Sequence, residues 1–109
     1  MIHGRYRVKV SGRLLFVDLE EIIRFEACGK STALFLRTQK EALIITHGIG
    51  YHCEQLRYLF LFCRIHESHL VNINEIYSQE GNRIYLKDHT PLPLSRSGRK
   101  ELNENPNMY

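Results

Sequence analysis

Apolar and polar residues alternate along most of the chain, in short runs that are rich in β-branched and aromatic side chains. Alternation with a period of two is typical of half-buried β-strands, and the Gly, Asn, Asp and Ser residues between the runs indicate turns. We predict strands at residues 6–10, 13–17, 22–27, 32–37, 41–46, 60–65, 70–74, 76–79 and 82–87. Residues 90–94 contain two prolines, which cannot donate ladder hydrogen bonds, so we expect an edge strand there. The pattern therefore predicts a mainly β fold, built as a meander of antiparallel hairpins.

Short helices interrupt these strands at two places. A weakly periodic segment after two glycines predicts a helix over residues 49–58. Ser95 is expected to cap a second helix at residues 96–103, because its hydroxyl can accept a hydrogen bond from a free amide of the first turn. Asp18 is expected to cap a single helical turn that ends at Glu21 in the same way.

The length and composition are those of one globular domain. The chain has 109 residues, 43% of them hydrophobic and 25% charged. We expect a single domain over residues 1–109, with a core at about 6–103 and a loose C-terminal tail at 104–109. The three cysteines are odd in number and widely spaced, which favours reduced thiols in the cytoplasm over a disulfide framework. No apolar stretch approaches the roughly 20 residues of a membrane helix, so no membrane partner is expected.

The charge balance is mildly basic, and its distribution is more informative than its size. Fifteen Lys and Arg face twelve Asp and Glu, for a net charge of +3. This excess permits binding to a polyanion without requiring it. The basic residues gather near the two ends of the chain, at Arg5, Arg7, Lys9 and Arg13, and at Arg96, Arg99 and Lys100. The first group alternates along a predicted strand, and we interpret it as a solvated face rather than a phosphate track.

The most specific motif lies at residues 64–76, with the sequence RIHESHLVNINEI. It resembles the motif of LytTR domains, in which Arg-apolar-His-x-Ser runs into apolar-Val-Asn. The resemblance extends to residues 18–27 (DLEEIIRFEA), to the turn at residues 29–31, and to residues 86–96, which end in LPLSR. These pieces follow one another in the family's order and cover roughly residues 7–102.

The resemblance implies a fold and a function. The fold is an elongated all-β architecture with short helices. The function is sequence-specific binding of double-stranded DNA by loops, in a bacterial transcription regulator that recognises repeated sites, often as a homodimer, and bends the DNA. An upstream receiver or sensor domain, or a histidine-kinase partner, is implied as well. Because the first strand begins soon after Met1, we expect either an excised output domain or a stand-alone regulator.

Three segments match the family's DNA-contacting regions. They contain Lys30, Ser31 and Thr32; His66, Glu67 and Ser68; and Arg96, Ser97 and Arg99. Lys and Arg side chains can neutralise phosphates and release counterions, or pair with guanine. The hydroxyls and the imidazole can donate to phosphate oxygens or base edges. Which of these residues read bases stays open at this point.

Two positions depart from the family pattern. Glu67 stands where LytTR domains typically carry a basic residue or an amide. A carboxylate is repelled by phosphates but can accept a hydrogen bond from the amino group of cytosine, so Glu67 is expected to alter specificity. Ser97 stands where a larger or basic residue is frequent, which leaves DNA contact at that point open.

Residues in and near the predicted contact segments can also have purely structural roles. His66 can be a histidine at the edge of the core that hydrogen-bonds the backbone, and this role is compatible with DNA contact. Arg64 is interpreted as structural because its neighbours are apolar. Asn72 and Asn74 are expected to close turns by bonding their own backbone.

Metal binding and catalysis find little support. His66 and His69 are three residues apart in a strand-like region, so they are expected to face opposite sides and not to share a metal. The cysteines lack zinc spacing, and Cys53 has only its neighbour His52 as a base. We expect no enzyme and no cofactor. Two rival functions are a protein-interaction β module without DNA affinity, which the charge of +3 and Glu67 favour, and a small-ligand or metal-binding β module using the histidines.

Overall fold

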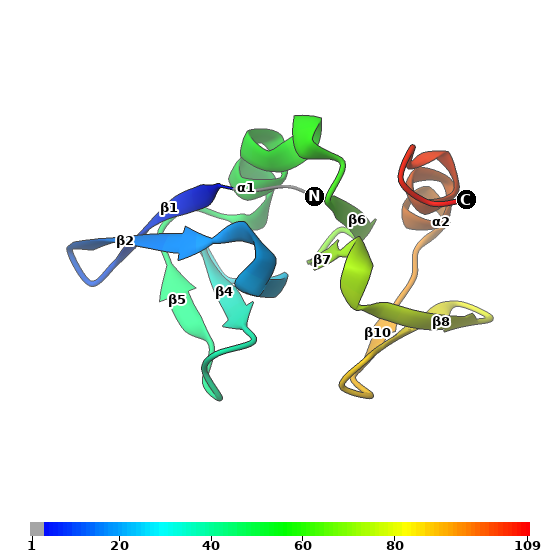
Figure 1. Ribbon diagram of the computed structural model, residues 1–109, viewed down its shortest axis with the longest axis horizontal. Coiled ribbons are helices and arrows are strands. Elements are labelled where there is room, and N and C mark those ends of the chain that lie inside the picture. Colours follow the sequence, from blue (N-terminus) through cyan, green and yellow to red (C-terminus); the bar gives the residue numbers. More distant parts are fainter. Residues whose placement is uncertain (1–3) are drawn as a thin grey trace.

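The computed structural model describes residues 4–109, which form ten strands, two α-helices and three 3-10 turns (Figure 1). The strands are β1 (Arg5–Val10), β2 (Arg13–Asp18), β3 (Ile22–Cys28), β4 (Ser31–Leu36), β5 (Leu43–Ile45), β6 (Phe62–His66), β7 (His69–Asn72), β8 (Ile76–Glu80), β9 (Arg83–Leu86) and β10 (Pro91–Pro93). The helices are α1 (Ile49–Leu56) and α2 (Arg96–Glu104), and the 3-10 turns are η1 (Leu19–Glu21), η2 (Arg57–Leu59) and η3 (Ile73–Glu75). The predicted mainly β class with two short helices is confirmed.

The strands form three antiparallel sheets. The central sheet has the order β5-β4-β3-β7-β6, and the two smaller sheets have the orders β1-β2 and β10-β9-β8. Figure 1 shows the β1-β2 ribbon and the β8–β10 sheet toward opposite ends of the long axis, with α1 above the central part and α2 near β8 and β10. The antiparallel hairpins expected from the sequence are thus distributed over three antiparallel sheets.

The apolar core is split between the two faces of the central sheet. Neighbouring residues on a strand point to opposite faces, and Phe62 and Leu70 belong to one buried cluster whereas Cys63 and Val71 belong to the other. The first cluster packs beneath α1 and the β1-β2 ribbon, and the second beneath α2 and the β8–β10 sheet. Full burial of one large apolar side chain contributes about 1.5–3 kcal/mol, so both layers are needed to hold the sheet.

The two predicted helix caps have different outcomes. Ser95 caps α2 as predicted, because its Oγ accepts a hydrogen bond from the Gly98 amide at 3.0 Å. The turn η1 forms as predicted, but Asp18 makes no capping hydrogen bond with its side chain, so that part of the prediction is wrong. The turn is held instead by the buried side chain of Leu19, whose amide donates to the Gly4 carbonyl at 3.1 Å.

Two element boundaries differ from the prediction. The strand predicted from residue 60 begins at Phe62, because Phe60 adopts a left-handed conformation with φ 54° at the end of η2. Residues 73–74 form part of η3 and not of a strand, since the Asn72 Oδ1 accepts from the Asn74 amide at 2.9 Å. The predicted turn-closing role of Asn72 is confirmed.

The C-terminal segment beyond α2 contacts the turn that follows η2. Asn105 is buried, and Nδ2 atoms of Asn105 and Asn107 donate to the Phe60 carbonyl at 3.3 and 3.1 Å. The first residues of the tail are therefore attached in this structure, while the looseness of the tail in solution stays a prediction. Across residues 4–109, the helices are too short or too polar to cross a bilayer.

Candidate nucleic-acid interface

Two of the three predicted DNA-contacting segments are turns at the same edge of the central sheet. The β3-β4 turn carries Lys30, and Cys28 lies opposite Ser31 in its register. The β6-β7 turn carries Glu67 and Ser68, and the Ser68 carbonyl accepts from the Ala27 amide of β3 at 2.9 Å. Because β3 and β7 are neighbours, the two turns lie about two strand spacings apart, or about 10 Å. That separation is on the scale of the DNA grooves, which are roughly 6 and 12 Å wide.

The third segment, the N-terminus of α2, reaches the same edge through β6. The Ser95 amide donates to the Ile65 carbonyl at 2.9 Å, which holds the start of α2 against the end of β6. A hollow of about 250 Å³ lies between them, lined by Arg64, His66, Glu67, Ser97 and Glu101. Three segments distant in the sequence therefore meet. We call this row, residues 30–31, 66–68 and 96–97, the turn edge.

Gly98, which was not among the residues predicted from the sequence, permits this close approach of α2. A Cβ atom at Gly98 would lie 1.9 Å from the Ile65 carbonyl oxygen, far inside van der Waals contact. Glycine is otherwise unfavourable inside a helix, by roughly 0.5–1 kcal/mol relative to alanine. A glycine in the first turn after a clear N-cap was the available signal.

The β6-β7 turn is rigidly supported by its own side chains. The Arg64 Nη2 donates to the Glu67 carbonyl at 2.8 Å, and the Ser68 amide donates to the His66 Nδ1 at 3.1 Å. Both structural interpretations from the sequence, a backbone-bonding His66 and a structural Arg64, are confirmed. Since Nδ1 accepts, the neutral His66 ring carries its hydrogen on Nε2, which leaves one donor for a ligand.

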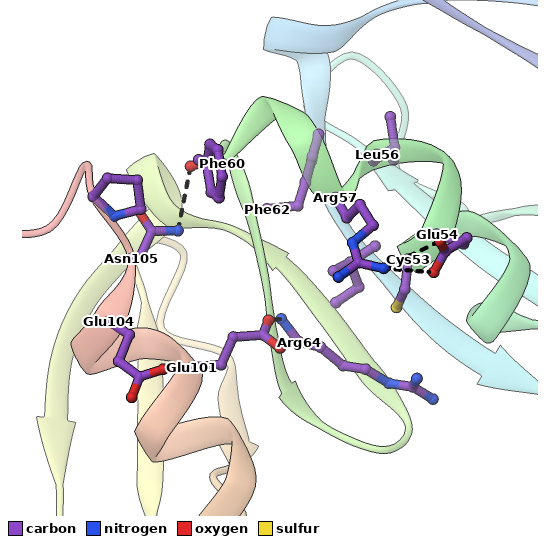
Figure 2. A pocket seen from close by; sticks show the side chains of 12 residues that line it. Cys53, Glu54, Leu56, Arg57, Phe60, Phe62, Arg64, Glu101, Glu104 and Asn105 are labelled. Carbon is purple, nitrogen blue, oxygen red and sulfur yellow. Dashed lines mark hydrogen bonds and ion pairs between the residues drawn. The ribbon is translucent and has the colours of Figure 1, made fainter.

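A larger pocket lies between α1 and α2 and shares Arg64 and Glu101 with the hollow beside the β6-β7 turn (Figure 2). Its volume is about 380 Å³, and its walls include Phe60 and Phe62. Three carboxylates, from Glu54, Glu101 and Glu104, line it against two arginines. One of them, Glu101, accepts from the backbone amide of Arg64 at 2.6 Å. This pocket lies away from the β3-β4 turn, and we do not include it in the candidate interface.

Comparison with known proteins identifies the family. Residues 12–106 match the family described as the LytTr DNA-binding domain. The chain belongs to this family. A solved structure from Bacillus cereus, described as the LytTr DNA-binding domain of a methyl-accepting/DNA response regulator, is similar with a TM-score of 0.70 and 17% sequence identity, over 96% of this chain and 98% of that one. At this identity the likeness shows the fold alone. A search of curated proteins found no match.

In this LytTR domain, four of the nine predicted contact residues are exposed. Lys30, Glu67, Arg96 and Ser97 are exposed, and their side chains are free to meet a ligand in front of the turn edge. Four others, Ser31, His66, Ser68 and Arg99, are half-buried, and Thr32 is buried. Contact of these residues with DNA stays a prediction.

Thr32 and Arg99 depart from the expected arrangement. Thr32 is fully buried, and its Oγ1 donates to the His47 carbonyl at 2.9 Å, so we correct the prediction that it meets DNA: it supports the end of β5 instead. The Arg99 Nη2 donates to the Gly81 carbonyl at 2.9 Å and to Asn82 Oδ1 at 2.8 Å. Arg99 therefore ties α2 to the β8-β9 turn, a role that its position in the sequence did not reveal.

His66 and His69 face each other, contrary to the expectation from strand spacing. A two-residue turn separates them, so they pair across the hairpin with ring centroids 5.6 Å apart. The His69 Nδ1 also lies 3.6 Å from the Glu26 carboxylate. Burial lowers the pKa of His69, against the opposing effect of Glu26, which favours a neutral ring. Over residues 4–109 there is no group of three or more His, Cys, Asp or Glu that could hold a metal ion.

Proposed function

We propose that this LytTR domain binds double-stranded DNA through the turn edge, as the output domain of a bacterial transcription regulator. The observation that supports this most directly is the meeting of three segments, far apart in the sequence, in one accessible row. Membership of a DNA-binding domain family supports the same ligand over a protein-interaction or metal-binding module. We propose no catalytic role for the domain.

Each part of the turn edge is suited to a different contact with DNA. Lys30 and Arg96 are exposed cations that can neutralise phosphates on either side of the β6-β7 turn. Ser68 and the His66 Nε2–H are donors for phosphate oxygens or purine acceptors. Glu67 is the exposed tip of the central turn, and its carboxylate can accept from a cytosine amino group. Phosphate contacts of Lys30 and Arg96 on either side would position the Glu67 carboxylate against a base edge.

The regulatory setting is proposed from the family. The domain would act in the cytoplasm on repeated DNA sites, with two protomers bound side by side. A receiver or sensor domain, or a histidine kinase, would control when it binds. These points concern partners that lie outside this chain, and they are independent of the contacts at the turn edge.

A salt titration tests the binding proposal. Fluorescence anisotropy of the 109-residue chain on a random-sequence duplex should show affinity that falls steeply between about 50 and 200 mM salt. Lys30→Gln should lower the slope of log K against log salt by about 0.9, the contribution of one phosphate contact. Lys40→Gln is the matched control, since Lys40 is exposed in the loop at the opposite end of β4. Affinity that does not change with salt would refute the proposal, and a melting temperature raised by zinc would favour the metal-binding alternative.

Selection of binding sites from a random library tests the role of Glu67. The parent domain should prefer cytosine at one position of its site, and Glu67→Gln should lose that preference by about 5- to 150-fold, or about 1–3 kcal/mol. Glu41→Gln, in the loop opposite the turn edge, should leave the selected sequence unchanged. An identical consensus for Glu67→Gln and the parent would exclude Glu67 as a base reader.

A further inference from the structure

The outer edge of β1 pairs with no further strand, and Thr46 is hydrogen-bonded to it at the Lys9 carbonyl. β1 pairs only with β2, through a two-residue turn at Ser11 and Gly12 with φ 48° and 80°. In such a hairpin the residues next to the turn exchange ladder hydrogen bonds, and every second residue does so after them. The backbone groups of Lys9, Arg7 and Arg5 therefore face away from β2. The Lys9 carbonyl agrees with this register, because it accepts from the Thr46 amide at 3.1 Å.

A basic groove lies between this outer edge and α1. Its volume is about 590 Å³, and Arg5, Arg7 and Lys9 line one wall while His47 and Tyr51 line the other. All of the residues that line it lack a carboxylate. The Tyr51 side chain is 45% exposed, and its ring stacks on His47 with centroids 4.0 Å apart, so the ring is accessible and supported on one side. The lining of the groove therefore favours an anion over a cation.

Arg7 and Lys9 make no ion pair among the described residues, whereas Arg5 lies opposite Asp18 in the β1-β2 register. The Arg5 guanidinium lies 5.8 Å from the centroid of the Phe16 ring, and Phe16 is itself exposed. Unpaired cations beside one another repel, and a bound anion relieves that repulsion.

The groove is continuous with the turn edge. In the β4-β5 register Ile45 lies opposite Thr32, so the residues that follow β5 come beside the β3-β4 turn. The Thr32 Oγ1 donates to the His47 carbonyl, and a Cβ at Gly48 would lie 3.9 Å from the Lys30 carbonyl oxygen. His47 therefore belongs both to the wall of the groove and to the surroundings of Lys30.

We propose that this groove binds the DNA phosphate backbone adjacent to the positions that the turn edge contacts. The inference rests on the proposed function. It adds a fourth segment, β1, to the three segments of the turn edge that would contact DNA. Arg7 and Lys9 neutralise one phosphate each, and the free amide of Arg7 and the hydroxyl of Tyr51 donate to phosphate oxygens. The N-terminal basic residues were interpreted from the sequence as a solvated face. In this proposal they bind DNA phosphates instead.

The experiment compares two charge-matched double variants of the full chain by fluorescence anisotropy on random-sequence duplex DNA. Arg7→Gln with Lys9→Gln removes two charges from the groove, and Arg83→Gln with Lys87→Gln removes two exposed charges from the β8–β10 side. The groove variant should lower the slope of log K against log salt by about 1.8, at about 0.9 for each phosphate. The control should leave the slope near that of the parent. All four side chains are exposed, so the melting temperatures should agree.

The outcomes separate the groove from the turn edge. If the groove variant matches its control while Lys30→Gln still lowers the slope, the groove inference is wrong and the proposed function stands. If the parent itself shows no salt-dependent binding to DNA, both fall. Tyr51→Phe gives a second measurement that keeps the stacked ring: loss of the hydroxyl should weaken binding about two- to tenfold. Unchanged affinity of both groove variants, together with retention of an acidic peptide on the outer edge of β1, would assign the groove to a protein ligand instead.

Discussion

The two faces of the central sheet are closed by different means. On one face, α1 and the β1-β2 ribbon enclose a hydrogen-bonded polar pair, the half-buried Tyr6 and the buried His52. On the other, α2 lies directly on the backbone of β6 at Gly98. On the first face, side chains that pack and hydrogen-bond hold α1 at a distance from the sheet. On the second, the lack of a side chain at Gly98 lets the backbone of α2 contact the backbone of β6 directly.

The polar pair beneath α1 is fully satisfied. The Tyr6 hydroxyl lies 2.6 Å from the His52 Nδ1, and the His52 Nε2 donates to the Thr46 carbonyl at 2.9 Å, so Nδ1 accepts from the tyrosine. The His52 ring also stacks on Phe25 with centroids 5.6 Å apart. Buried polar groups stabilise a fold only when each has its partner. The pair therefore fixes the position of α1, as well as filling the core.

The largest effect is expected from Gly98→Ala. The new methyl group cannot be accommodated, because its neighbours are backbone atoms of Ile65 and not a flexible side chain. We expect about 3 kcal/mol or more of destabilisation in urea unfolding, with displacement of α2. DNA binding should weaken as well, because the start of α2 belongs to the turn edge. The control is Gly50→Ala in α1, where no atom lies within 4 Å and a gain of about 0.4–1 kcal/mol is expected. Equal effects of the two substitutions would contradict the contrast between the faces.

Removal of one hydroxyl tests the face beneath α1. Tyr6→Phe leaves the His52 Nδ1 buried without its donor, which should cost about 1–3 kcal/mol in thermal or urea unfolding. Tyr77→Phe serves as control, since that side chain is 76% exposed and should show no change. If Tyr6→Phe is neutral, the face is held by packing alone.

A smaller contrast is expected between the helix caps. Ser95→Ala removes the hydrogen bond to the Gly98 amide and should destabilise the protein by about 1 kcal/mol. α1 has no side-chain cap, since Gly48 stands at that position with φ −76°, a conformation open to any residue. Gly48→Ser should therefore stabilise the protein by about 0.3 kcal/mol. A loss of stability for Gly48→Ser would show that the lack of a cap on α1 serves the contact with Lys30.

Acid pH should lower the stability of the protein gradually, through His52 and His69. Burial lowers the pKa of His52 and of His69 below the usual 6.5, so the folded protein binds fewer protons than the unfolded chain just below that pH. Stability is therefore greatest above about pH 6.5 and falls as the pH drops toward the folded-state values. Urea midpoints at about pH 7.5 and about pH 5 measure this. His69→Gln should reduce the difference, whereas the exposed His89→Gln should not. A midpoint that rises in acid would oppose the prediction.

Local features of the fold could be predicted from the sequence because they depend on near neighbours. Alternation located the strands, and the Ser95 cap and the Asn72 turn follow from a side chain reaching its own backbone. The division into three sheets could not be predicted, since pairing between distant strands leaves no local pattern. The boundary at Phe60 depends on a left-handed residue whose conformation comes from η2, and not from its own type.

The candidate site was predictable in part for the same reason. The residues of the three segments could be named from their family resemblance and their chemistry, and they do meet at one edge. Tertiary structure decided what each one does there. Thr32 is buried and hydrogen-bonds the segment after β5, and Arg99 hydrogen-bonds the β8-β9 turn. The β6-β7 hairpin places the His66 ring beside the His69 ring. None of these partners is close enough in sequence to influence a local motif.

The environments of the three thiols differ sharply. Burial raises the pKa of Cys63 to about 12 and also raises that of Cys53, whereas Cys28 is exposed at the end of β3, two residues before Lys30. A thiol reacts as its thiolate, and only where a reagent can reach it. A maleimide dye or spin label should therefore modify Cys28 selectively. The native chain already carries a probe beside its proposed DNA contact, and time-resolved spectroscopy could follow association without engineering a cysteine.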